Sequence, residues 1–74
     1  MAFDNGAMGK ALKERRKEAG MTQMDLASAA GMSSVNLISK YETGSMIPGG
    51  DKVWDMAVAL GCSPNEILGW PKQK

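Results

Sequence analysis

Apolar residues recur at three- and four-residue intervals through most of this chain, which is the spacing of one face of an α-helix. No stretch shows the alternation of apolar and polar residues that is typical of a β-strand. Proline and glycine divide the pattern into five segments. The predicted helices cover about residues 7–19, from Gln23 to just before Gly31, from Ser33 or Ser34 to about Glu42, 51–60, and a short stretch from Pro64 through Leu68. The fold class is therefore all-α.

The ends of these segments carry helix-capping residues. Gly20 stands where a helix C-cap needs a left-handed residue, and Thr22 with Asp25 three positions on forms a variant of the capping box. Gly31 permits the positive φ that reverses the chain after the second helix. Ser63, Pro64 and Glu66 supply an N-cap, a first-turn proline and an N3 acid for the fifth helix.

The apolar spacing also predicts the core. The first helix presents its apolar side at Met8, Ala11, Leu12, Arg15 and Ala19; the second at Leu26, Ala27 and Ala30; the third at Ile38 and Tyr41, with Val35 at the margin; and the fourth at Val53, Met56, Ala57 and Leu60. With the third helix oriented this way, its opposite face carries hydrogen-bonding side chains, namely Asn36, Ser39, Lys40 and Thr43. Residues 22–43 thus have the outline of a helix-turn-helix, whose second helix can lie in the DNA major groove.

Length and composition limit the alternatives. With 74 residues the chain is one small domain, for which a partner subunit would add buried surface. We expect a loose arm at 1–6, the domain at 7–69 and a tail at 70–74. The single cysteine, Cys62, excludes an intrachain disulfide, and the sequence contains neither a signal peptide nor an apolar run long enough for a membrane span. We therefore expect a cytoplasmic protein.

Enzymatic functions have no support in the residues. The chain has no histidine, and Cys62 has no base partner of the usual kind. Acid pairs, phosphate-cradling glycine loops and metal-ligand clusters are also missing from the sequence. We expect no catalytic residue, metal, cofactor or small-molecule substrate.

The net charge of +1 is low for a nucleic-acid binder, but the basic residues are unevenly distributed. The first twenty positions contain Lys10, Lys13, Arg15, Arg16 and Lys17 against Asp4, Glu14 and Glu18. Such a run is either a solvated helix face or a patch that contacts phosphates. The neighbouring helix-turn-helix pattern favours the second interpretation.

Taken together, the run LKERRKEAGMTQMDLASAAGM, then ISKYETG, a loop ending in Pro48, and VWDMAVALGCSPNEIL resembles the Cro/repressor-type helix-turn-helix family over about residues 10–69. That family includes phage repressors and small bacterial regulators. The resemblance implies a compact five-helix, lambda-repressor-like domain that binds double-stranded DNA, usually as a homodimer on a palindromic operator, and regulates transcription.

The resemblance also implies site residues, although one residue more than usual between Gly31 and Gly44 allows two alignments. Aligned from Ile38, Tyr41 and Glu42, the base-reading positions are Val35, Asn36 and Lys40, with Ser39 close by and Ser34 near a phosphate; aligned from Gly31, they are Ser34, Val35 and Ser39. We use the first alignment, because Ile38, Tyr41 and Glu42 must fit the core. An Asn can pair with adenine, a Lys with guanine, and a Val methyl can contact the thymine methyl.

Other positions match the family's phosphate contacts and its internal ion pair. Gln23 corresponds to a glutamine that contacts a phosphate and braces the third helix. Thr43 is a further candidate for phosphate contact, as is one of Lys10, Lys13 and Lys17, of which we take Lys13. Arg16 and Glu42 occupy the positions of an ion pair that fixes the angle of the recognition helix. Two departures are the uncharged loop residues Ser45, Met46 and Ile47, which predict weaker phosphate binding, and Gly49, which stands where a Ser or Thr often caps the fourth helix.

The C-terminal apolar residues Ile67, Leu68 and Trp70 have two interpretations, a dimer contact or closure of the core. The hypothesis for function is a small dimeric repressor that reads double-stranded DNA. The alternative is a protein-interaction module, antitoxin-like or an adaptor, that uses the same fold with weak DNA binding. The low net charge and the uncharged loop favour the alternative.

Overall fold

The computed structural model describes residues 5–68, and within that range all regular structure is helical. The five helices are α1 (Asn5–Glu18), α2 (Gln23–Ala29), α3 (Val35–Thr43), α4 (Gly50–Leu60) and α5 (Pro64–Leu68). The predicted all-α class with five helices is confirmed. None of the helices in the described range is long and apolar enough to cross a membrane.

The capping residues stop and start the helices where the sequence predicts. The Thr22 hydroxyl accepts from the Asp25 amide and Asp25 accepts from the Thr22 amide, both at 3.0 Å, so the capping box of α2 is complete. Gly31 has φ 74° and turns the chain towards α3, and Gly44 has φ 81° at the end of α3. Only glycine adopts a left-handed backbone conformation at little cost in free energy, which explains why these two positions are glycines.

Three helix bounds differ slightly from the predictions. Helix α1 begins at Asn5, so the last two residues of the expected arm at 1–6 are already helical, whereas residues 1–4 lie outside the described range. Helix α3 begins at Val35 with Ser34 as its N-cap, which decides between the two serines. Helix α4 begins at Gly50 after Gly49, which gives no side-chain cap hydrogen bond.

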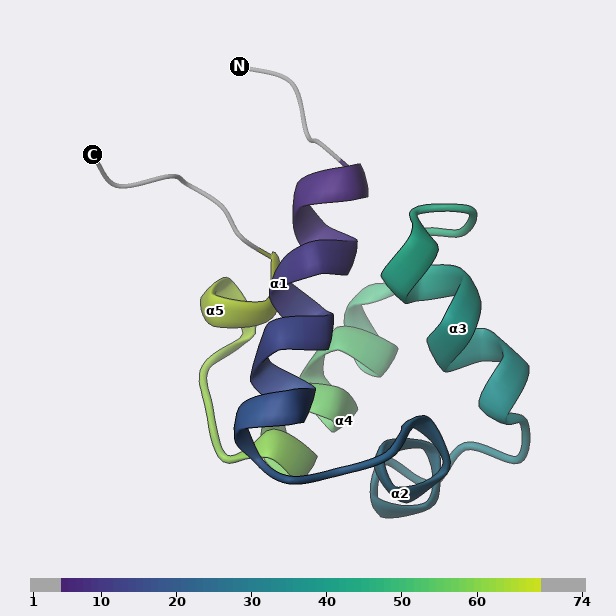
Figure 1. The fold of residues 1–74 in the computed structure, drawn as a ribbon, viewed down its shortest axis with the longest axis vertical. Helices are drawn as coiled ribbons and strands as arrows, with labels where there is room; N and C mark the ends of the chain where they lie inside the picture. The colour runs from purple at the N-terminus through teal and green to yellow at the C-terminus, as the bar shows by residue number, and fades with distance from the viewer. Residues whose placement is uncertain (1–4, 69–74) are drawn as a thin grey trace.

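Helix α1 is the central element of the arrangement. It contacts α3 on one side and α5 on the other, while α2 contacts both α3 and α4, and α4 contacts α5. In Figure 1, α1 stands between α3 and α5, and α2 lies at the bottom of the view, joined by a short linker to the lower end of α3. The helix-turn-helix unit formed by α2 and α3 therefore rests against α1 and α4.

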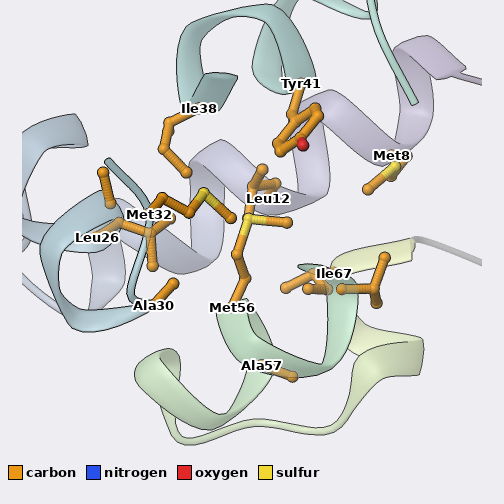
Figure 2. Packing of buried hydrophobic residues seen from close by; sticks show 12 residues of the cluster. Met8, Leu12, Leu26, Ala30, Met32, Ile38, Tyr41, Met56, Ala57 and Ile67 are labelled. Atoms are coloured by element: carbon orange, nitrogen blue, oxygen red, sulfur yellow. The ribbon is translucent and has the colours of Figure 1, made fainter. Parts of the chain in front are cut away.

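The core lies where the five helices converge (Figure 2). Its fully buried side chains are Met8, Leu12, Leu26, Ile38, Met56 and Ile67. The predicted inward faces of α2 and α3 are confirmed, since Leu26, Ala27, Ala30, Ile38 and Tyr41 are all buried. On α1 the pattern differs, because Ala19 is exposed and Arg16 is buried instead.

The C-terminal end of the described range completes this core. Ile67 is 0% exposed and packs in the same cluster as Leu12 and Met56, so its side chain closes the core and is not available at the surface. Of the two interpretations of this residue, core closure is the one that the packing supports. The side chain of Leu68 and the whole of Trp70 lie outside the described residues.

Candidate functional site

The exposed side of α3 is the surface that the sequence analysis singled out. Ile38 and Tyr41 are buried, which fixes the rotation of the helix about its axis. Asn36, Lys40 and Thr43 are then exposed, at helical spacings of four and three residues along one face. This is the register that alignment from Ile38, Tyr41 and Glu42 requires. We call Asn36, Lys40 and Thr43 the exposed row of α3. Hydrogen-bonding side chains on one face of a short helix are suited to contacting base edges in a DNA groove.

The flanking residues are only partly exposed. Val35 and Ser39 are half-buried, and Ser34 caps the helix by accepting a hydrogen bond from the Asn36 amide at 3.2 Å. At the other end the Thr43 hydroxyl donates to the Lys40 carbonyl oxygen at 3.2 Å and shares a 2.9 Å hydrogen bond with the Ser45 hydroxyl. Hydrogen bonds of Ser34 and Ser45 therefore hold the two ends of α3 on either side of the exposed residues.

An open hollow of about 250 Å³ adjoins the start of this row, between α2 and α3. Its lining residues are Met24, Ala27, Ser28, Met32, Ser33 and Val35. Most of the side chains are apolar, and Met24 is 67% exposed. The N-terminal end of α3 thus combines an apolar surface with the polar Asn36.

Glu42 holds the C-terminal turn of α3 to two other helices. Arg16 of α1 donates from Nε to Oε2 at 2.6 Å and from Nη2 to Oε1 at 3.1 Å. Gln23, the first residue of α2, donates from Nε2 to Oε1 at 3.0 Å. The predicted ion pair is therefore present, and it is bidentate, the geometry in which an arginine and a carboxylate bind most strongly.

This junction is largely removed from water. The side chains of Arg16 and Glu42 are 9% and 3% exposed, and Arg16 also donates from Nη1 to the Met21 carbonyl oxygen at 2.8 Å. Within the described residues, no buried side-chain nitrogen or oxygen is left without a hydrogen-bond partner. A buried ion pair with all its hydrogen bonds formed fixes geometry, because breaking any one bond leaves a desolvated charge.

Gly9 contributes to the same junction and was missed by the sequence analysis. It is buried in α1, and a Cβ built there would lie 2.7 Å from the carbonyl oxygen of Tyr41 and closer still to that of Glu42. Both atoms belong to the backbone of α3, so neither can move as a side-chain end can. The available signal was a glycine inside a helix, where it costs about 1 kcal/mol relative to alanine and so calls for a packing reason.

The basic residues of α1 are divided between internal and exposed positions. Arg15 pairs with Glu18 at 3.2 Å and with Glu66 of α5 at 3.0 Å, and Arg16 is held by Glu42. The exposed lysines are Lys10, Lys13 and Lys17. Of the five-residue basic run, the three lysines are thus exposed, Arg15 is paired but still 42% exposed, and Arg16 is buried.

The loop between α3 and α4 is apolar at its surface. Met46 and Ile47 are 39% and 56% exposed, while Pro48 is buried. Its first residues are held to α3, because the amides of Ser45 and Met46 donate to the Lys40 carbonyl oxygen.

The resolved pKa shifts reflect capping and burial. The backbone N–H of Thr22, and then its hydroxyl, lowers the pKa of Asp25, and the Ser63 N–H, followed by the Ser63 hydroxyl, does the same to the pKa of Glu66. Burial, with the charge of Asp51, raises the pKa of Tyr41. Burial, with the charge of Glu66, also raises the pKa of Cys62. None of these groups belongs to the exposed row of α3.

Comparison with known proteins now decides the family. Residues 12–67 match the model of the helix-turn-helix family, which is most of the chain. The chain belongs to the helix-turn-helix family. The match begins at Leu12 in α1 and ends at Ile67 in α5, so it includes Arg16, Gln23, Glu42 and the whole exposed row.

One curated member of this family is similar over nearly the whole chain. It is the HTH-type transcriptional regulator DicA of Escherichia coli, 35% identical over 68 residues. The alignment covers 92% of this chain and 50% of DicA, so the chain spans about half the length of that relative.

Solved structures of the family have the same fold. The restriction-modification controller protein C.AhdI from Aeromonas hydrophila superposes with a TM-score of 0.82 at 26% identity, covering 86% of this chain and 96% of its own. The P22 c2 repressor, solved in complex with a synthetic operator, gives a TM-score of 0.75 at 32% identity and covers 81% and 89%. The fold is thus shared with both solved structures, and the three relatives are a transcriptional regulator, a restriction-modification controller and a repressor.

Proposed function

We propose that this chain is a sequence-specific, double-stranded DNA-binding repressor, that it acts as a cytoplasmic homodimer on a palindromic operator, and that α3 is its recognition helix. The observation that carries the proposal is the geometry of α3. Its inner side is fixed by Ile38 and Tyr41 and its end by Glu42, while Asn36 and Lys40 are exposed one turn apart. Support comes from the P22 c2 repressor, which was solved with a synthetic operator.

The proposed contacts follow from the chemistry of the major groove. Asn36 donates to and accepts from adenine, Lys40 donates to guanine, and Val35 contacts a thymine methyl, with Ser39 between them. Gln23, Ser34, Thr43 and Lys13 contact phosphates, and so set the position of the domain along the duplex. The binding requires no metal, cofactor or catalytic group.

Gln23 would then have two roles. Its side-chain amide donates to Glu42, while its place at the N-terminus of α2 puts it where a phosphate oxygen is favoured by the helix amides. A glutamine that contacts the backbone and also braces α3 couples phosphate contact to the placement of the recognition helix.

Selection of bound sites from random duplex DNA tests the proposal. We expect an enriched inverted repeat with half-sites about one helical turn apart, and a complex of two chains per site by sedimentation. A salt titration on random duplex accompanies it. Affinity should fall by roughly 0.9 log units per log unit of salt for each phosphate contacted.

The competing function is a protein-interaction module, which the exposed Met46 and Ile47 favour because the loop between α3 and α4 offers apolar side chains and no cation to a phosphate. The two functions predict opposite results in the same experiments. No enriched motif, with a flat or undetectable salt response, would contradict DNA binding and support the interaction module.

A further inference from the structure

The recognition surface depends on how α3 is held, and two attachments to α1 hold it. One is the Arg16–Glu42 ion pair, a contact between side chains. The other is the close approach at Gly9, where the α1 backbone meets the carbonyl groups of Tyr41 and Glu42 directly. The two attachments lie about two helical turns apart on α1, with the fully buried Leu12 between them. Both attachments reach the C-terminal turn of α3, one at the Glu42 side chain and one at the Tyr41 and Glu42 carbonyls, so this turn is held from two separated points along α1 and its orientation is restricted as well as its distance.

We propose that Gly9 is a positioning residue for sequence recognition, because its missing side chain sets the angle at which α3 presents Asn36 and Lys40. This inference rests on the proposed DNA-binding function. A methyl group at position 9 would overlap backbone atoms of α3, so the C-terminal turn of that helix must move away from α1. The Glu42 side chain stays bound to Arg16 while the Tyr41 and Glu42 carbonyl groups are pushed away from position 9, so α3 is displaced by a tilt and is not released from α1.

A tilt and a loss of folding have different effects on DNA binding. A partly unfolded chain binds every sequence more weakly by the same factor, so the ratio of affinities for the selected site and for random duplex does not change. A tilted α3 misplaces the base-reading side chains, whereas phosphate contacts adjust more easily, so the ratio falls. The ratio therefore separates a positioning role from a merely structural one.

The matched control is Gly50, the first residue of α4. It also has a helical backbone, but a Cβ built there meets nothing within 4 Å. Gly50→Ala therefore makes the same chemical change, hydrogen to methyl in a helix, without contact with α3. Any effect that Gly9→Ala has and Gly50→Ala lacks comes from the contact.

The first experiment measures the ratio of the affinities for the selected site and for random duplex, in the wild-type chain and in the two variants. We expect Gly9→Ala to lower the ratio roughly 5- to 150-fold, the range that corresponds to losing one good base contact, and Gly50→Ala to leave it unchanged. Combining Gly9→Ala with Asn36→Ala should lower the ratio by less than the product of the two single effects, since both act through the same contact. An unchanged ratio in Gly9→Ala, or multiplicative effects in the double variant, would overturn the proposal.

A second experiment needs no DNA and keeps this proposal separate from the proposed function. Backbone amide chemical shifts of the folded Gly9→Ala chain should change along α3 from Tyr41 back to Asn36, whereas those of Gly50→Ala should change only around α4. Shifts that stop at the residues touching position 9, or a Gly9→Ala chain that does not fold at any temperature, would overturn the positioning role. If wild-type protein shows no sequence preference while these shifts are seen, the proposed function fails and the placement of α3 by Gly9 stands.

Discussion

The guanidinium of Arg16 and the carboxylate of Glu42 form a bidentate pair that joins the first helix to the end of the third, with Glu42 only 3% exposed. Because Gln23 also donates to Glu42, one carboxylate orients three helices. The orientation of α3 is thus determined at its C-terminal end, away from the Asn36 end of the exposed row.

Removing Arg16 should strongly destabilise the domain. Arg16→Met leaves the Glu42 carboxylate buried without its cation, and such losses cost about 3–5 kcal/mol. Urea unfolding measures the change in the free energy of unfolding. Lys17→Met, at the exposed neighbouring position, should change it by less than about 0.5 kcal/mol.

Replacing Arg16 and Glu42 together tests whether the loss of stability in Arg16→Met comes from leaving the Glu42 carboxylate unpaired. A chain with both Arg16→Met and Glu42→Met should lose less than the sum of the two single variants, because no charge is left buried alone. Additive losses would contradict a coupled pair.

Replacing the exposed row should alter sequence preference at little cost to stability. Asn36→Ala and Lys40→Ala should each relax the preference at one base pair by about 1–3 kcal/mol of discrimination, measured by repeating the site selection. The midpoint of urea unfolding should hardly change, because both side chains are exposed.

Gln23→Ala provides the contrast for that experiment, because it should weaken binding to all sequences by a similar factor. Unchanged preferences in both α3 variants would reject the assignment of Asn36 and Lys40 as base-reading residues.

The glycine that ends α3 should tolerate substitution poorly. Gly44 has φ 81°, where a Cβ costs about 1–2 kcal/mol, so Gly44→Ala should lower the free energy of unfolding by that amount. Gly50→Ala should be neutral or stabilising by up to about 1 kcal/mol, since its surroundings are open. Equal effects of the two substitutions in thermal or urea unfolding would show that the left-handed backbone is not what Gly44 supplies.

Acid should weaken the caps of α2 and α5. The Asp25 and Glu66 carboxyls have pKa values below their ordinary range when folded, because backbone amides of Thr22 and Ser63 donate to them. In acid the unfolded chain therefore binds more protons at these two carboxyls than the folded chain does. The stabilisation is complete above the ordinary carboxyl pKa near 4 and disappears as the pH falls through the lower, folded pKa values.

Urea unfolding between pH 7 and pH 3 measures this dependence. We expect a nearly constant contribution from the caps down to about pH 5 and a decline below it. Asp25→Asn should flatten that decline, and a variant as acid-sensitive as the wild type would show that the cap of α2 does not contribute.

The sequence predicted the parts of the fold that depend on local chemistry. Helical spacing identified Ile38 and Tyr41 as buried, and capping residues placed the start of α2. The Arg16–Glu42 pair followed from a family resemblance, because nothing local relates two residues 26 positions apart. Gly9 could not be predicted in the same way. Its role depends on where the α3 backbone lies relative to α1, and that is a property of the tertiary structure.

The role of the C-terminal residues also depends on tertiary structure and could not be predicted from the sequence. Apolar character at Ile67 fits a core and an interface equally well, and only the position of α5 against α1 and α4 brings this side chain into the core. The exact start of α3 was also ambiguous, since Ser33 and Ser34 are both good caps, and only the structure shows that Ser34 is the residue whose hydroxyl accepts from the Asn36 amide.

The side chains that hold α3 and those that it exposes are separate sets. Ile38, Tyr41 and Glu42 face the protein, while Asn36 and Lys40 make no contribution to the core. If α3 reads DNA as proposed, target preference can diverge in evolution through substitutions at its exposed positions while the buried residues keep the fold stable. A library randomised at the exposed positions of α3 is thus a natural starting point for giving this small domain a new target.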